Sequence, residues 1–187
     1  MTDKLFISAN DLLIDSFKLA KNIVDSGYKP NYIVAIWRGG TPIGMAIQEY
    51  LTYNNINADH IAIKTSAYDK GIGVMKKKIT VNGLSYIVNK VNSHDKLLII
   101  DDVYDTGLSV NEVINTIHKK SRKNAPEIKI ATVYYKPSNN KTQLKPDFYI
   151  HETNKWIVFP HELDGLTKGE IVNGKNLKNI KEFFDKE

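Results

Sequence analysis

Residues Leu97–Ser109 read LLIIDDVYDTGLS. Four consecutive aliphatic residues are followed by two adjacent aspartates, and then by a short polar turn that contains a third aspartate, Asp105. An apolar run of this kind is typical of a strand that is covered on both faces of a parallel sheet. Ligands bind outside the carboxyl ends of such strands, so the three carboxylates indicate a binding site.

The turn after this strand has the composition of a phosphate-binding loop. Residues Asp105–Ser109 lead directly into helical spacing, so backbone amides and two hydroxyls can converge on a phosphate at the positive end of a helix. Gly107 allows the backbone to come close. The pair Asp101 and Asp102 suits vicinal ribose hydroxyls or a magnesium ion and its waters instead. Together these groups indicate an activated sugar phosphate as ligand.

Helical and strand-like segments alternate along the rest of the chain, which is typical of a parallel α/β sheet. Helices are predicted over residues 9–26, 43–53, 84–91 and 110–117, and strands over residues 32–37, 61–64, 96–101 and 128–135. Residues 65–80 are polar and show no clear period, which predicts a flexible loop. The extended pieces KPDFYI and KWIVFP, followed by a small amphipathic helix at Leu177, Ile180 and Phe184, predict a tail that packs over one edge of the sheet as a hood.

Bulk properties limit the classes of function. A chain of 187 residues fits one domain. The absence of cysteine excludes thiolate metal sites and cysteine nucleophiles. No apolar run approaches the roughly 20 residues that cross a bilayer, and the start shows no secretion leader, so we expect a cytoplasmic protein without membrane contact. The net charge of +5 is scattered apart from Lys76–Lys78, which favours an anionic small ligand over nucleic acid.

Two motifs carry a resemblance to a known family. The strand with Asp101-Asp102 and the turn Asp105-Thr106-Gly107-x-Ser109 resemble the signature of the type I phosphoribosyltransferases, which bind 5-phosphoribosyl 1-pyrophosphate (PRPP). WRGGTPIG, residues 37–44, resembles the pyrophosphate loop of that family, and SAYD, residues 66–69, its flexible loop. The resemblance implies an α/β fold with a central, mainly parallel twisted sheet flanked by helices. It further implies one domain over residues 1–187, with a core at about 8–145 and a hood at about 1–7 and 146–187.

The resemblance also implies roles for the residues of these motifs. Arg38 and the backbone at Gly39 and Gly40 would hold the leaving pyrophosphate, together with Tyr68 of the flexible loop, and the peptide bond between Trp37 and Arg38 would be cis. PRPP would be bound by Asp101, Asp102, Asp105, Thr106, Gly107, Leu108 and Ser109. The implied cofactor is Mg²⁺, held through waters by Asp101 and Asp102, with Glu162 as a further contact near the metal or the base.

Asp105 and the tail indicate which base is transferred. The family members that act on 6-oxopurines carry aspartate at this position, where it would take the proton that a purine loses as its ring nitrogen attacks the anomeric carbon. Lys136 resembles the lysine that contacts the 6-oxo group. KWIVFPHE resembles the segment in which an aromatic residue, here Trp156, stacks on the base while the Ile157 backbone meets the purine edge. Val158 stands where some guanine and xanthine enzymes have glutamate, which leaves the preferred 2-substituent open.

Simpler interpretations stand beside these. Paired aspartates after a strand are most often solvated turn or helix-capping residues, Trp156 alone is more often packing than a stacking platform, and Lys136 alone is most often solvated. We therefore weigh two hypotheses. The first is a magnesium-dependent salvage enzyme for hypoxanthine, guanine or xanthine that forms a homodimer or homotetramer, as its family does. The second is a non-catalytic regulator that senses PRPP and binds nucleic acid, and Asp105 and Arg38 argue against it.

Overall fold

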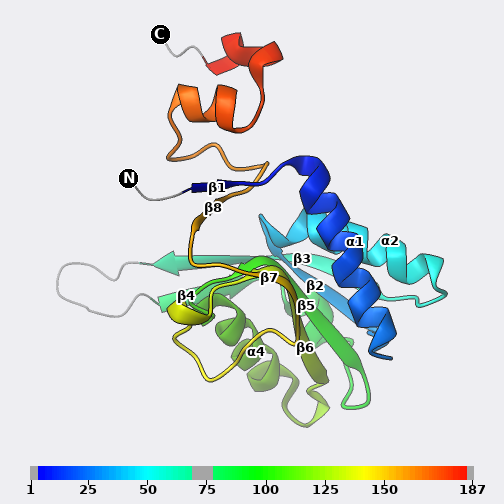
Figure 1. Cartoon of the computed structure of the whole chain (residues 1–187). Helices are drawn as coiled ribbons and strands as arrows, with labels where there is room; N and C mark the ends of the chain where they lie inside the picture. The colour runs from blue at the N-terminus through cyan, green and yellow to red at the C-terminus, as the bar shows by residue number, and fades with distance from the viewer. Residues whose placement is uncertain (1–3, 69–77, 185–187) are drawn as a thin grey trace.

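The structure is a computed structural model that describes residues 4–68 and 78–184 (Figure 1). Six strands form one sheet in the order β4-β3-β2-β5-β6-β7, and all neighbours are parallel except β3 and β4. The strands are β2 (Tyr32–Trp37), β3 (Asp59–Tyr68), β4 (Lys78–Asn82), β5 (Lys96–Tyr104), β6 (Glu127–Tyr135) and β7 (Phe148–Glu152). The predicted fold class, a mainly parallel α/β sheet, is therefore confirmed.

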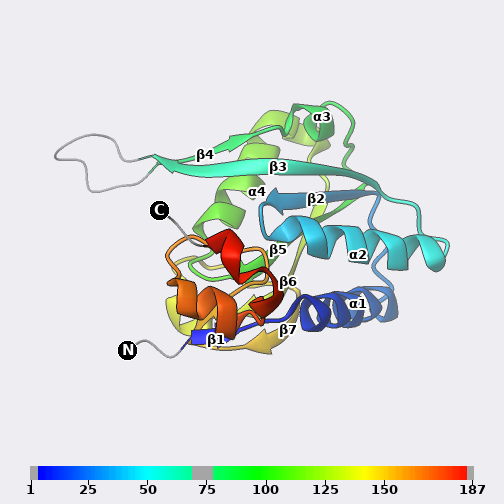
Figure 2. The ribbon, with the colours of Figure 1, turned by 90° about the horizontal axis from the view of Figure 1, so that it is seen from above.

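Helices cover both faces of this sheet (Figure 2). They are α1 (Ala9–Asp25), α2 (Gly40–Tyr53), α3 (Ser85–Val88) and α4 (Leu108–Ser121). One apolar cluster joins α1 and α2 to the sheet, and a second joins α3 and α4 to the opposite face. β5 supplies both clusters, since Leu98 and Ile100 face the first while Leu97 and Ile99 face the second, all fully buried. The aliphatic run of the sequence is thus the centre of a three-layer core.

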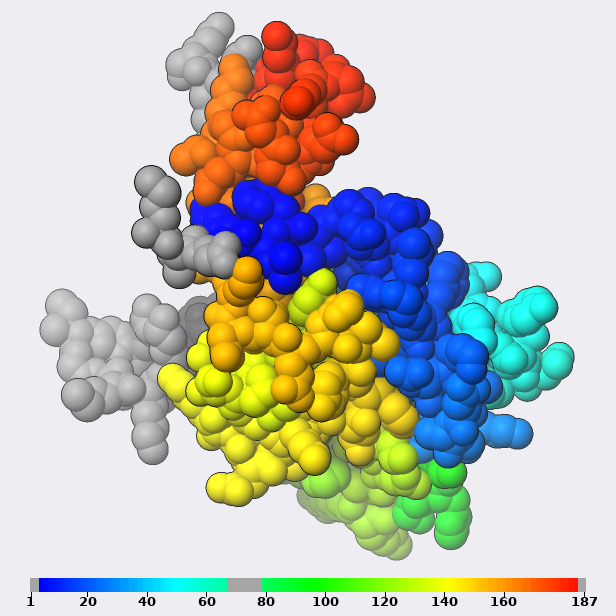
Figure 3. Space-filling model, viewed as in Figure 1, coloured from blue at the N-terminus to red at the C-terminus, as the bar shows by residue number. Residues whose placement is uncertain are grey.

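The hood is built from both ends of the chain. β1 (Lys4–Phe6) pairs in parallel with β8 (Trp156–Val158), with Lys4 opposite Trp156. Beyond β8, a π-helix (Glu170–Gly174) and a 3₁₀ segment (Lys178–Phe184) form a lobe that stands above the N-terminal residues (Figure 3). An ion pair of 2.6 Å between Lys4 and Glu170 ties this lobe to β1.

The structure corrects several predicted boundaries. Residues 65–68 and 78–80 are not loop but the ends of β3 and β4, which pair antiparallel, while residues 69–77 of the predicted flexible loop lie outside the described residues. β7 pairs with β6, so the core sheet continues past residue 145. The predicted C-terminal helix is present as a 3₁₀ segment, Lys178–Phe184, and its backbone kinks at Ile180. Leu177, Ile180 and Phe184 are half-buried, and the residues between them are exposed. Within the part of the chain that the structure describes, no helix is both long and apolar enough to cross a membrane.

Candidate active site

The two unusual loops of the sequence lie at the same edge of the sheet. β2 and β5 are parallel neighbours, and the loop with Arg38 follows β2 while the loop with Asp105 follows β5. The chain continues to β3 on one side and to β6 on the other, so the sheet order reverses between these two strands. A crevice at the carboxyl ends of strands at such a reversal is the expected ligand site of an open α/β sheet.

The Arg38 loop presses directly against the end of β5. Its entry peptide bond, Trp37-Arg38, is cis, as the resemblance implies. A Cβ atom at Gly39 would lie 1.7 Å from Oδ2 of Asp102, and one at Gly40 would lie 2.3 Å from the carbonyl oxygen of Ile100. Both distances are far below van der Waals contact. A Cβ at Gly40 would collide with backbone, whereas one at Gly39 would require the Asp102 side chain to move. The close approach brings Arg38 and the aspartate pair into one site.

The aspartate pair is partly held by its own backbone. The amide of Asp102 donates to Oδ1 of Asp101 at 3.0 Å, and the amide of Val103 donates to Oδ1 of Asp102 at 2.8 Å. Burial, and secondly the charge of Asp102, raise the pKa of Asp101 well above its usual range. A bound cation, or hydroxyl groups that donate hydrogen bonds, would offset the repulsion between the two carboxylates. The pair is therefore suited to the proposed sugar and magnesium contacts.

The donor set fits magnesium rather than a metal enclosed by protein ligands. Among residues 4–68 and 78–184, no three His, Cys, Asp or Glu side chains are arranged to hold a metal ion. Mg²⁺ is commonly bound through one or two carboxylates, with waters and substrate oxygens completing its shell. Asp101 and Asp102 can supply such carboxylates.

One neighbour of the pair was not predicted. Nε2 of His161 lies 3.6 Å from Oδ2 of Asp102, and its ring stacks on Phe159 at a centroid distance of 5.6 Å. No sequence pattern predicts this contact, because the histidine belongs to the hood and reaches the sheet only through the fold.

The Asp105 loop surrounds a small hollow of about 80 Å³. The residues that line it are Asp101, Val103, Tyr104, Asp105, Thr106, Gly107, Ser109 and Val110. Gly107 precedes α4 with φ +74°, and a Cβ there would lie 2.5 Å from the Tyr104 hydroxyl oxygen. That hydroxyl lies 2.9 Å from Oγ1 of Thr142, so Tyr104 supports the loop from below. Leu108 is exposed. The hollow at the start of α4 is lined by Asp105, Thr106, Gly107 and Ser109 of the turn that the sequence predicts to bind a phosphate.

The Asp105 carboxylate lies near Lys136, which the sequence predicts at this site, and near Asn139, which it does not predict. Nζ of Lys136 lies 3.7 Å from Oδ2 of Asp105, and Nδ2 of Asn139 donates to Oδ1 at 2.8 Å. The Lys136 side chain is 12% exposed and that of Asp105 is 43% exposed, so the carboxylate faces the site while the lysine is mostly covered. Asn139 follows a proline in a polar turn, where sequence alone gives asparagine no special role.

The tail residues gather around Arg38. A hollow of about 130 Å³ is lined by Arg38, Trp156, Val158, Glu162, Asp164 and Leu166. Trp156 is 56% exposed, which leaves its ring open to a ligand, whereas Ile157 is buried in the core. Oε2 of Glu162 accepts from the Phe159 amide at 3.1 Å, so one carboxylate oxygen serves the local turn. Tyr68 is described only as the last backbone position of β3.

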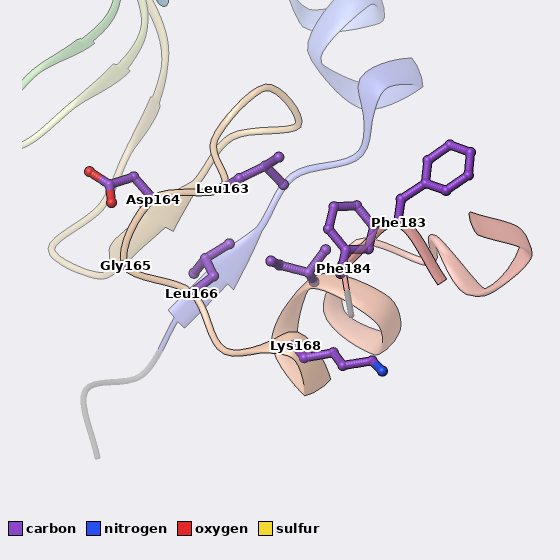
Figure 4. Close-up of a pocket in the computed structure, with 8 residues that line it drawn as sticks. Leu163, Asp164, Gly165, Leu166, Lys168, Phe183 and Phe184 are labelled. Carbon is purple, nitrogen blue, oxygen red and sulfur yellow. The ribbon is translucent and has the colours of Figure 1, made fainter. Parts of the chain in front are cut away.

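A larger hollow of about 640 Å³ lies in the hood (Figure 4). It is lined by Leu163, Asp164, Gly165, Leu166, Lys168, Ile171, Phe183 and Phe184. In Figure 4 the carboxylate of Asp164 points away from the two phenylalanine rings. The cavity has few of the polar groups that a sugar phosphate needs, so we place the candidate active site at the two loops instead.

A family model described as "Phosphoribosyl transferase domain" matches residues 8–165. The chain therefore belongs to the phosphoribosyltransferase domain family. A comparison with curated proteins finds no match.

Solved structures make the likeness more specific. A purine phosphoribosyltransferase from Pyrococcus horikoshii is 27% identical, with a TM-score of 0.68 over 88% of this chain and 97% of that chain. A Helicobacter pylori xanthine-guanine-hypoxanthine phosphoribosyltransferase shares the fold at 19% identity, with a TM-score of 0.65 over 96% and 99%. A hypothetical protein from Neisseria gonorrhoeae with bound ppGpp shares it at 19% identity, with a TM-score of 0.73 over 88% and 92%. The predicted likeness to type I enzymes of the 6-oxopurine kind is confirmed.

Proposed function

We propose that this chain is a purine salvage enzyme. It transfers the 5-phosphoribosyl group from PRPP to a 6-oxopurine and releases pyrophosphate and the nucleoside 5′-monophosphate. Hypoxanthine is the favoured base, and guanine and xanthine are alternatives. The observation that carries this proposal is the carboxylate of Asp105, a residue that lines the hollow before α4 and has Nζ of Lys136 3.7 Å from its Oδ2.

Separate groups of residues bind the phosphate, ribose and pyrophosphate parts of PRPP. The 5′-phosphate occupies the hollow of the Asp105 loop, where backbone amides at the start of α4 and the hydroxyls of Thr106 and Ser109 bind it. Asp101 and Asp102 bind the ribose hydroxyls and the magnesium waters. When bound, magnesium neutralises charge on the departing pyrophosphate. Arg38 and the backbone of the loop behind it bind that pyrophosphate as it leaves.

The base side of the site performs the proton transfer. As the bond from the purine nitrogen to the anomeric carbon forms and the bond to pyrophosphate breaks, Asp105 accepts the proton that the purine loses. Lys136 donates to the 6-oxo group, and the open ring of Trp156 stacks on the base. Glu162 contributes near the metal or the base through the carboxylate oxygen that the turn leaves available.

The proposal extends to the setting of the enzyme. We expect one phosphoribosyltransferase domain that acts in the cytoplasm as a homodimer or homotetramer. Light scattering of the purified protein measures its mass in solution, and a monomer at working concentration would contradict the oligomer.

The test is a spectrophotometric assay with magnesium, PRPP and each of hypoxanthine, guanine, xanthine, adenine and orotate. We expect turnover with at least one 6-oxopurine and none with orotate. Tight PRPP binding without turnover of any base would instead support the regulator hypothesis. In an active protein, Asp105→Asn should lose most turnover and retain PRPP binding, since it keeps the shape of the side chain and removes the base; unchanged turnover would show that Asp105 is not the base.

A further inference from the structure

Among residues 4–68 and 78–184, each oxygen of the Asp105 carboxylate has one partner, and both partners come from the turn after β6. Asn139 donates from Nδ2 to Oδ1 at 2.8 Å, while Nζ of Lys136 lies 3.7 Å from Oδ2. The first contact is a hydrogen bond of normal length and the second is a longer ion pair. The two oxygens therefore have different environments, with Oδ1 fixed by an amide and Oδ2 directed toward the lysine.

The turn that carries Asn139 is fixed to the Asp105 loop by backbone bonds on both sides. The Lys136 amide donates to the Tyr104 carbonyl at 2.9 Å, and the Lys141 amide donates to the Thr106 carbonyl at 3.0 Å. Between them, the short 3₁₀ turn Pro137–Asn139 closes with a bond from the Asn139 amide to the Lys136 carbonyl at 3.1 Å. Asn139 and Asp105 thus belong to one framework, so the amide sets the direction of the carboxylate.

We propose that Asn139 is a positioning residue for Asp105. It fixes the carboxylate by holding Oδ1, which leaves Oδ2 toward Lys136 and the incoming purine. This inference rests on the proposed function. The side chain of Asp105 is 43% exposed, so without the amide it can rotate into water. A base that must be found in one orientation loses rate when it samples several, because a misplaced group contributes little to the transition state.

The neighbouring asparagine provides a matched control. Nδ2 of Asn140 donates to the Leu144 carbonyl at 2.7 Å, and its Oδ1 accepts from the Thr142 amide at 2.9 Å. Asn140 therefore stabilises the same segment without contacting Asp105. Because Asn139 and Asn140 are the same type of residue in the same turn, comparing their variants distinguishes a loss of turn stability from a loss of Asp105 orientation.

The test compares three single variants in the assay described above. Asn139→Ala should lower kcat about tenfold and change KM for PRPP by less than about twofold, because the phosphate and pyrophosphate contacts remain. Asn139→Asp should lower kcat further, since a second carboxylate repels Asp105. Asn140→Ala should lower Tm more than Asn139→Ala and lower kcat less. Rescue of kcat by Asn139→Gln, which restores an amide donor, would support the positioning role.

A double variant separates positioning from general damage to the fold. In an Asp105→Asn background, adding Asn139→Ala should cost almost no further activity, because the group that it orients is already lost. Unchanged kcat in Asn139→Ala, or losses in both asparagine variants that follow Tm alone, would overturn the inference while the proposed function stands. A wild-type protein that turns over no base would overturn the proposed function, and the inference with it.

Discussion

The two loops of the site are held in place in opposite ways. The Arg38 loop is positioned by the absence of side chains, because Gly39 and Gly40 lie where any Cβ would collide with the end of β5. The Asp105 loop is positioned by added polar contacts, which come from Tyr104, Asn139 and the backbone of the turn after β6. Adding a Cβ at Gly40 should therefore destabilise the first loop in one step, whereas removing single polar contacts should weaken the second loop gradually.

Gly40→Ala should have the largest effect. Its Cβ would lie 2.3 Å from the carbonyl oxygen of Ile100 and 3.0 Å from the carbonyl carbon, both in the backbone of the central strand. Because backbone there cannot move without disturbing two apolar clusters, we expect a loss of about 3 kcal/mol in the free energy of unfolding. Urea denaturation measures it. Gly169→Ala is the control, since a Cβ at Gly169 meets nothing within 4 Å; equal stability of the two variants would contradict the steric account.

Gly39→Ala should affect ligand binding more than stability. The atom that its Cβ would meet, 1.7 Å away, is Oδ2 of Asp102, at the end of a side chain that can rotate. Rotation of Asp102 relieves the collision at a cost of about 1 kcal/mol in the free energy of unfolding, but moves a carboxylate away from the proposed sugar and magnesium contacts. We expect PRPP affinity in the presence of magnesium, measured by calorimetry, to fall about tenfold. Wild-type affinity would show that Asp102 does not contact PRPP.

Tyr104→Phe tests the loop that depends on polar contacts. It removes the hydroxyl that lies 2.9 Å from Oγ1 of Thr142 and donates to the Leu144 carbonyl at 3.2 Å, and leaves the buried ring in place. We expect a loss of about 1 kcal/mol in the free energy of unfolding, as for one buried hydrogen bond, with turnover largely kept. Tyr53→Phe, at an 84% exposed position, is the control. A loss as large as that of Gly40→Ala would remove the contrast between the loops.

The smallest effect lies outside both loops, where the hood depends on an ion pair. The hydrogen bond from Lys4, with a backbone contact at Thr167, lowers the pKa of Glu170 from 4.5 to about 2. A lowered carboxyl pKa in the folded state stabilises the fold above the unfolded pKa, and that stabilisation is lost as the pH falls toward the folded value. After correction for the pH dependence of intrinsic amide exchange, hydrogen-exchange protection in β1 and β8 should therefore fall from about pH 5 to about pH 2.5. Lys4→Gln should flatten this dependence, and an identical profile in both proteins would contradict it.

The sequence predicts those parts of the site that are formed by a few consecutive residues. The aliphatic strand and its aspartates, the glycine before α4, and the Arg-Gly-Gly loop each carry their chemistry within a few residues, and the structure places them at one edge of the sheet. The cis bond before Arg38 followed from the family resemblance rather than from the residues. Lys136 was located by its place at the end of β6.

Contacts between distant segments were missed. Asn139 and His161 acquire their partners, Asp105 and Asp102, only when separate turns meet at the sheet edge, and neither is distinguished by its neighbours in the sequence. The polar ends of β3 and β4 carry no strand signal in the sequence, because a strand pair at the sheet edge, held by backbone hydrogen bonds, needs no apolar alternation. β7 is the other edge strand of this sheet, so its sequence likewise does not reveal that it joins the core sheet.

The parallel pairing of β1 with β8 has a consequence for biosynthesis. Lys4 emerges from the ribosome early, but its partner Trp156 is made some 150 residues later. All strands from β2 to β6 are synthesised before β8, so β1 has no partner until they are complete. Closing so long a loop is slow relative to local structure formation. The nascent protein should therefore form the two loops proposed to bind PRPP first, and should place Trp156, proposed to stack on the base, last.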